Sequence, residues 1–165
     1  MTDFIAFKLY GKDFRYYDDT RIDYEFRNIR NNWKPVAISI NCKIYKIIQF
    51  YIDNKKYQMG LHRVIYYVHH PEWDIYDGSK DNYIDHINHT AGEPADNSIT
   101  NLRVVTKQQN SFNTNARGYS WEKRFKKWRA EICVNGKSIY LGMFSIESDA
   151  RDAYLNAKAT YHIFD

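Results

Sequence analysis

The chain has 165 residues, enough for one domain of ordinary size or two small ones, and this length excludes large multidomain architectures. Its formal net charge of +4 favours an anionic partner, although many proteins that bind nothing acidic carry a charge this small. Only two cysteines are present, Cys42 and Cys133, and they form no C-x-x-C pair. This excludes a disulfide framework and a structural zinc knuckle.

The cellular location follows from the same features. Unpaired cysteines are typical of a reduced, intracellular protein. The opening sequence MTDFIAFKLY has no cationic segment followed by an apolar run, and no stretch approaches the roughly 18 apolar residues needed to span a bilayer. We therefore expect a soluble protein that is neither secreted nor in a membrane.

The N-terminal third changes character at Pro35. Residues 1–34 mix aromatic and charged side chains without a sustained period, and we assign this segment no function. From residue 35 to residue 60 the chain is rich in Ile, Tyr and Val and is interrupted by turn residues such as Asp53-Asn54, which predicts an antiparallel meander. Between Lys34 and Arg63, six basic residues face one acidic residue.

A helix and then a strand–loop–strand–helix unit are predicted next. Apolar residues at helical spacing in HRVIYYVHH, before Pro71, indicate a short helix. YIDHI then predicts a strand, NHTAGEPADNSIT a long polar loop, NLRVV a second strand and TKQQNSFNTNA a helix with Thr106 as its N-cap. Gly118 ends this unit and marks a domain boundary.

The tail beyond Gly118 predicts a small sheet with one helix packed across it. KKWRAEICV alternates apolar and polar positions, Asn135-Gly136 is a strong hairpin signal, and KSIYLGMF supplies the returning strand. Ser145 is placed to cap a helix whose stripe runs from Ala150 to Tyr161. Alternation in the strands assigns Trp128, Tyr140 and Phe144 to the core.

Four polar residues in the middle of the chain offer the chemical groups that metal-dependent hydrolysis needs. Asn101 follows His86 by fifteen positions, Asn110 follows Asn101 by nine, and Asp85 is adjacent to His86. A hard divalent ion prefers oxygen ligands and keeps several waters, so Asp85 and Asn110 suit it as ligands. A neutral imidazole takes a proton from attacking water, which is the role predicted for His86. Adjacent strand residues point to opposite faces, so this pair can share a site only where the strand ends, as the polar loop from Asn88 indicates.

These residues also carry a family resemblance. YIDHIN, followed by NSITNLRVVTKQQNSFN, resembles the D-H-I-(D/N)...N-x-x-x-N-L-R-x-V-T-x-x-x-N-x-x-N signature of phage and intron-encoded HNH endonucleases over about residues 60–115. The resemblance implies that His86 is the general base, that Asp85 and Asn110 bind the metal, and that Asn101 braces the loop carrying the base. It also places Arg103 on DNA, and it places His62 and Asn113 beside the site without an assigned role.

A second resemblance covers the tail. RGYSWEKRFKKWRAEI, with Y-L-G-M-F and D-A-R-D-A-Y-L-N-A, resembles the three-stranded DNA-binding domain of plant ethylene-response factors. In that family the exposed sheet face enters the major groove and the helix supports it. The candidates for DNA contact are accordingly Arg117, Trp121, Arg124, Lys126, Lys127, Arg129 and Lys137. This stretch holds seven basic residues against two acidic ones from Arg117 to Lys137, a pattern that fits phosphate contact or a merely solvated face.

The expected fold is therefore α+β. A ββα-metal HNH core is preceded by the antiparallel meander and followed by a three-stranded antiparallel sheet with one packed helix. The expected division is residues 1–34 with no assigned role, 35–116 for the nuclease and 117–165 for DNA binding.

The expected function is a monomeric, homing-type HNH endonuclease that nicks or cleaves double-stranded DNA. It would use one divalent ion, Mg²⁺ in the first place and Mn²⁺ in the second, and no obligate protein partner. Two alternatives stay open at this point. One is a non-catalytic DNA-binding protein whose nuclease site has decayed, and the other is a structure-specific or RNA-directed nuclease.

Overall fold

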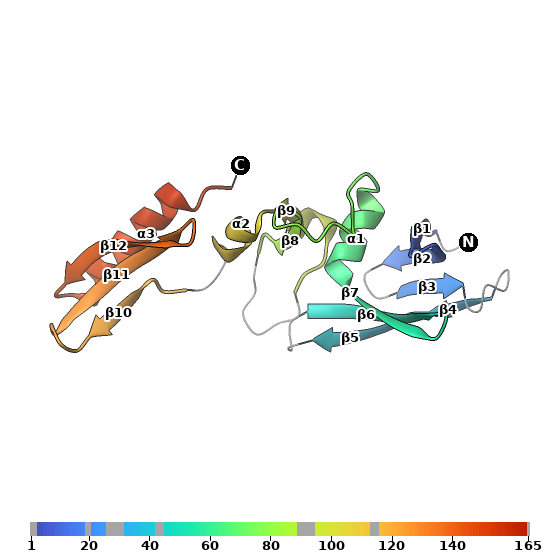
Figure 1. The fold of residues 1–165 in the computed structure, drawn as a ribbon, viewed down its shortest axis with the longest axis horizontal. Helices are drawn as coiled ribbons and strands as arrows, with labels where there is room; N and C mark the ends of the chain where they lie inside the picture. Colours follow the sequence, from blue (N-terminus) through green and yellow to red (C-terminus); the bar gives the residue numbers. More distant parts are fainter. Residues whose placement is uncertain are drawn as a thin grey trace. The chain divides into compact units, whose positions relative to one another are not determined.

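The chain divides into two compact units, Met1–Val104 and Val105–Asp165, which are described separately below (Figure 1). The computed structural model describes residues 3–18, 21–25, 32–41, 45–88, 95–112 and 116–164. No helix within these ranges is both long and apolar enough to cross a membrane. The fold is mixed, with antiparallel sheets and three α-helices in the described residues, as the α+β class predicts. The predicted division at residues 34 and 116 stays a prediction.

The first 34 residues, which sequence patterns left unassigned, contribute to a four-stranded antiparallel sheet. Its strands, in spatial order, are β1 (Ile5–Leu9), β2 (Lys12–Asp18), β3 (Arg21–Glu25) and β4 (Trp33–Pro35). The alternation is hard to see in the sequence because both faces carry aromatic side chains. Phe14 is fully buried, whereas Trp33 stacks on the Arg15 guanidinium, 3.9 Å from ring centroid to Cζ. Cation–π stacking of this kind keeps an aromatic ring on the outer face.

The predicted meander is confirmed as a second antiparallel sheet. It consists of β5 (Ala37–Asn41), β6 (Tyr45–Ile52) and β7 (Lys55–Gly60). The β6–β7 turn has positive φ at Asp53 and Asn54, 48° and 63°. That is the tight hairpin geometry that Asp and Asn tolerate better than most residues.

Helix α1 (Leu61–His69) follows β7 directly and confirms the helix predicted before Pro71. Its apolar stripe is buried, and it shares one core with residues from the first two sheets, among them Phe14, Ile48 and Phe50. Residues of the N-terminal segment, of the meander and of α1 therefore share one hydrophobic core.

The next elements follow the predicted order of strand, loop, strand and helix. They are β8 (Tyr83–His86), a 3-10 turn η2 (Ile99–Asn101), β9 (Leu102–Val105) and α2 (Lys107–Phe112), with β8 and β9 paired. Most of the loop between β8 and η2, from residue 89 to residue 94, lies outside the described residues, as do residues 113–115 after α2. The ββα-metal arrangement itself stays a prediction.

The predicted N-cap of α2 is confirmed in detail. The Thr106 hydroxyl accepts a hydrogen bond from the Gln109 backbone N–H at 3.1 Å, and the Gln109 side-chain oxygen accepts one from the Thr106 N–H at 2.9 Å. This reciprocal pair satisfies two backbone donors that a helix start would otherwise leave exposed.

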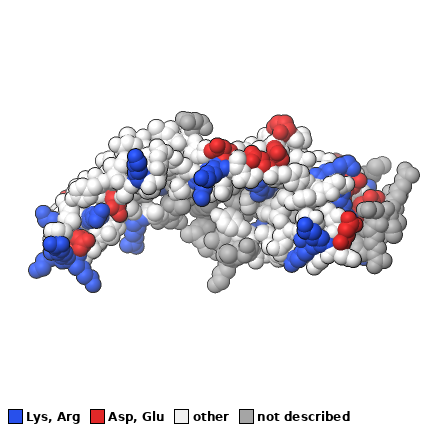
Figure 2. Space-filling view, viewed as in Figure 1, with Lys and Arg blue, Asp and Glu red and all other residues white. Residues whose placement is uncertain are grey.

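The C-terminal unit has the predicted three-stranded sheet and helix. Strands β10 (Tyr119–Glu122), β11 (Lys127–Val134) and β12 (Lys137–Phe144) lie in sequence order, and α3 (Glu147–Tyr161) packs on them. The hairpin at Asn135-Gly136 is confirmed, with φ of 52° and 72°. Figure 2 shows a cluster of basic side chains over the β10–β11 turn. The exposed cations of this turn, called the basic tip below, are Lys123, Arg124, Lys126 and Lys127.

Gly118, predicted as a domain boundary, is packed into the core of the C-terminal unit. Its φ is +67°, and a Cβ there would lie 2.0 Å from ring carbons of Tyr154 on α3. Its carbonyl accepts a hydrogen bond from Glu131 N–H at 2.9 Å. Only glycine fits this combination of backbone conformation and close ring contact.

Two details of the tail differ from prediction. The N-cap of α3 is Ile146, without a side-chain cap, so the prediction of Ser145 as the cap was wrong. Tyr140 is 57% exposed, although it was assigned to the core. The cause is a register shift after Ala130, which places Tyr140 opposite Glu131 on the outer face. Trp128 and Phe144 are half-buried.

Candidate active site

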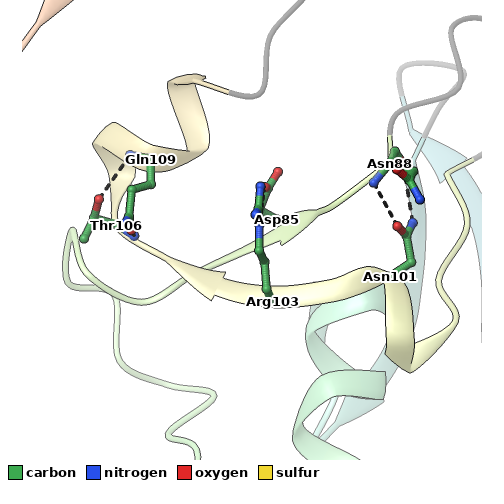
Figure 3. Close-up of polar contacts among 6 residues, drawn as sticks. All are labelled: Asp85, Asn88, Asn101, Arg103, Thr106 and Gln109. Atoms are coloured by element: carbon green, nitrogen blue, oxygen red, sulfur yellow. Dashed lines mark hydrogen bonds and ion pairs between the residues drawn. The ribbon is translucent and has the colours of Figure 1, made fainter. Parts of the chain in front are cut away.

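Asp85, on β8, is almost fully buried and ion-paired. Its side chain is 1% exposed, and Arg103 of β9 donates to Oδ2 from Nε at 3.1 Å and from Nη2 at 2.9 Å (Figure 3). The two residues lie on paired strands, so the sheet itself brings them together. Arg103, predicted as a DNA contact, is 26% exposed at its side chain and holds the carboxylate in place.

His86, the next residue, is also buried, at 2% exposure. Its Nε2 lies 2.9 Å from Oδ1 of Asn97. The ring centroid is 5.3 Å from that of His62 and 5.6 Å from that of Tyr45. His86 thus contacts α1 and β6, whereas Asp85 pairs with β9, as expected for neighbours on a strand.

Asn101 ties together the two ends of the polar loop. Its Oδ1 accepts a hydrogen bond from Asn88 N–H at 2.8 Å, and its Nδ2 donates to the Asp96 carbonyl at 2.9 Å. Its own carbonyl accepts from Ile87 N–H at 2.9 Å. With the residue only 5% exposed, these bonds are shielded from water. This geometry suits the bracing role that the family resemblance implies for Asn101 (Figure 3).

His62 is fixed beside His86 by the backbone beneath it. A Cβ added at Gly60 would lie 2.6 Å from Cε1 of His62, so the ring occupies space that only glycine leaves. Burial, together with the nearby charges of His86 and Arg63, lowers the pKa of His62 to about 4. Tyr45 of β6 faces the same ring at 5.9 Å. His62 is therefore neutral at pH 7.

This lowered pKa predicts an acid-sensitive fold. In the unfolded chain His62 takes a proton near pH 6.5, but in the folded chain only near pH 4. Between these values the unfolded state binds more protons, so stability is full above pH 6.5 and falls as the pH drops towards 4, by up to about 3 kcal/mol. We expect the free energy of unfolding, measured with urea, to change less with pH in the His62→Gln variant than in wild type across this window.

The exposed His69, changed to Gln in the same way, is the matched control. An equal pH slope in wild type and in the His62→Gln variant would contradict the assignment.

The remaining ligand candidates lie after β9. Asn110 is half-buried on α2, where its backbone N–H donates to the Thr106 carbonyl at 2.9 Å. Asn113, predicted beside the site, lies outside the described residues. Of the two cysteines, Cys42 also lies outside them. Cys133 is exposed.

The candidates for DNA contact in the C-terminal unit do not all lie on one surface. Arg124, Lys126 and Lys127 belong to the basic tip. Arg129 lies on the outer face of β11, ion-paired with Glu131 at 2.8 Å, whereas Trp121 pairs in register with Trp128 on the helix side. Arg117 and Lys137 are also exposed but belong to none of these locations, and Lys137 directly follows the β11–β12 turn.

Sequence reasoning missed Asn97 and Tyr45 as neighbours of His86. Asn97 is the first Asn of the N-x-x-x-N interval that the family signature contains, so the spacing was a usable signal. Tyr45 had none, because only the fold places the start of β6 against the end of β8.

A hard divalent ion requires oxygen ligands. Within the described part of the chain, no group of three or more His, Cys, Asp or Glu side chains could hold a metal ion. Mg²⁺ does not require such a group, since it is commonly bound through one or two carboxylates together with water and phosphate oxygens. Asp85 has a carboxylate and Asn110 an amide oxygen, and both are ligand types that Mg²⁺ accepts.

Comparison with known proteins gives two matches, one to a phage protein and one to a family model. The chain is similar to Protein 3.8 of Escherichia phage T7, with 32% identity over 75 residues that cover 39% of this chain and 60% of that protein. The chain therefore spans less than two thirds of this relative's length. No solved structure is significantly similar to the chain. Residues 59–112 match the family model of HNH endonucleases.

Proposed function

We propose that this chain is a divalent-metal-dependent endonuclease that hydrolyses phosphodiester bonds in double-stranded DNA. The observation that carries the proposal is the succession of Asp85 and His86 at the end of β8, with Nε2 of His86 2.9 Å from Oδ1 of Asn97, inside the segment matched to HNH endonucleases. A base and a carboxylate in consecutive positions supply the two groups that metal-assisted hydrolysis needs.

The chemistry assigns each side chain one task. A water molecule attacks the phosphorus, His86 takes the proton that the water loses, and the bond from phosphorus to the leaving sugar oxygen breaks. Asp85 and Asn110 would hold Mg²⁺, or Mn²⁺ in its place, which neutralises charge developing on the phosphate and on the leaving oxygen. Arg103 orients the Asp85 carboxylate, and Asn101 keeps the loop ends together.

Substrate competition tests this proposal against its alternatives. Supercoiled plasmid, single-stranded DNA, branched DNA and RNA are offered together to the full chain in Mg²⁺. We expect duplex DNA to be cut first and EDTA to stop the reaction. Faster cutting of branched DNA or RNA would make the protein a structure-specific or RNA-directed nuclease. Binding without any cutting would make it a DNA-binding protein with a decayed site.

Mapping the cut ends of genomic DNA then tests the homing-type assignment, which requires a small number of preferred sites. Scattered cuts would contradict it. Sedimentation of the protein on DNA tests the proposed monomer.

We further propose that the C-terminal unit positions the duplex through its basic tip. The four side chains are exposed, and they cluster on one turn with only Glu122 and Glu131 as acidic residues in the neighbouring strands β10 and β11. Neutralising phosphates releases counterions, so log affinity falls with log salt by about 0.9 per contact on duplex DNA. The resemblance to ethylene-response-factor domains stays a prediction, because the family match ends at residue 112.

Changing all four tip residues to Gln is expected to reduce this salt slope by about 3, if at least three of them contact phosphates. Fluorescence anisotropy with a labelled duplex at several salt concentrations measures it. Lys55→Gln with Lys56→Gln is the matched control, because both lysines are exposed at a hairpin turn of the meander. A slope that falls in the control but not in the tip variant would assign the DNA contact to the meander instead of the basic tip.

A further inference from the structure

Asn97 is held in place independently of the residue that it contacts. Ser98 donates to both carboxylate oxygens of Asp96, from N–H and from the hydroxyl, at 2.9 Å each. Asn101 N–H donates to the Ser98 carbonyl at 2.9 Å, and Asn101 Nδ2 binds the Asp96 carbonyl. Hydrogen bonds therefore hold the segment on both sides of Asn97, whose Oδ1 lies 2.9 Å from Nε2 of His86.

We propose that Asn97 is a positioning residue that fixes the tautomer of His86, with the ring proton on Nε2 and the basic lone pair on Nδ1. The catalytic consequence rests on the proposed function, but the tautomer itself does not.

The hydrogen bond determines where the proton lies. Oδ1 of Asn97, 2.9 Å from Nε2, is a carbonyl oxygen and can only accept, so Nε2 must donate. A neutral imidazole carries one ring proton, so Nδ1 is then the nitrogen that can take a proton from water. With Asn97 3% exposed and His86 2% exposed, water does not compete for this bond.

The reverse orientation of the amide would remove the base. If Nδ2 of Asn97 faced the ring, it would donate to Nε2 and the ring proton would move to Nδ1, leaving neither nitrogen able to act on water. Within the described part of the chain, Nδ2 of Asn97 is buried without a hydrogen-bond partner, and Oδ1 is the amide atom that faces the ring.

Asn97 and Asn101 have different tasks although they are four residues apart. The Asn101 side chain bonds to backbone groups of Asn88 and Asp96 at the loop ends. Asn97 bonds to the ring of the base. A change at Asn101 should therefore disturb the loop, whereas a change at Asn97 should act on the proton of His86.

Nitrogen-15 NMR of the full chain with labelled histidine tests the tautomer directly, at an alkaline pH where all six histidine rings are neutral. His162 is an internal reference, because its Nε2 lies 3.2 Å from the Cys133 carbonyl, which can only accept. We expect His86 to show the same pattern as His162, with protonated Nε2. A protonated Nδ1 in wild-type His86 would overturn the proposal whether or not the protein cuts DNA.

Two variants separate positioning from packing. Asn97→Leu keeps the volume and removes the acceptor, whereas Asn97→Asp keeps an acceptor on the ring. We expect Asn97→Leu to alter the His86 tautomer pattern and to lower single-turnover cleavage about 10- to 100-fold with little change in KM. Asn97→Asp should retain the pattern and recover most of the rate. An unchanged tautomer pattern in Asn97→Leu, or equal loss in both variants, would assign Asn97 a structural role only.

Discussion

Replacing His86 with alanine is expected to slow DNA cleavage by about 10²- to 10⁴-fold while the affinity for duplex DNA stays near that of wild type. The imidazole would act only on the attacking water, so its loss removes a proton acceptor from the reaction and little from the bound ground state. The ring is buried against His62 and Tyr45, hence the variant also loses some packing.

The measurement is single-turnover nicking of supercoiled plasmid, with binding followed by anisotropy in Ca²⁺ or without metal. His69→Ala, an exposed histidine at the end of α1, is the control for the loss of any imidazole. His86→Gln retains more of the packing volume and guards against an effect on folding. Equal cleavage by wild type and both His86 variants would remove this residue from the mechanism.

Asp85→Asn is expected to abolish most cleavage and to raise the Mg²⁺ concentration required for the remainder. The amide keeps the shape of the carboxylate but loses its charge, so a hard cation is bound less tightly. It also leaves the Arg103 guanidinium, 26% exposed, without its counter-charge. We expect the free energy of unfolding to fall by about 2 kcal/mol for this reason.

Asp23→Asn separates the two effects. Asp23 is another buried aspartate paired with an arginine: Nη2 of Arg21 donates to its Oδ2 at 2.9 Å on β3. This variant should also lose stability, but its Mg²⁺ titration should remain that of wild type. If Asp85→Asn and Asp23→Asn show the same Mg²⁺ titration, Asp85 is not a metal ligand.

Local sequence patterns predicted the fold at positions where the residue type determines the backbone conformation. Asn135-Gly136 specified its hairpin because both positions need positive φ, and Thr106 with Gln109 specified the start of α2. The sheet of residues 5–35 escaped prediction because stacked cations such as Arg15 hold aromatic rings on its outer face. Tyr140 was misplaced because a bulge shifts the register without leaving a sign in the alternation.

Sequence spacing selected the candidate site residues, which stay predictions, but it did not predict their contacts. Spacing selected Asp85, His86 and Asn101 because the strand and the turn that carry them are close together in the sequence. The partners of Asp85 and His86 come from residues such as Arg103 and Tyr45, which reach them only through strand pairing and packing of the core. Asn97 lay within the recognised interval, yet its contact with Nε2 depends on the turn that follows it.

The most direct test of the account is the conversion of supercoiled plasmid by the purified full chain in Mg²⁺, with EDTA added to a parallel sample and His86→Ala run beside both. The account predicts nicked or linear product with wild type in Mg²⁺ and almost none in the other two samples. Equal conversion in EDTA, or equal conversion by His86→Ala, would contradict a metal-dependent nuclease site at β8.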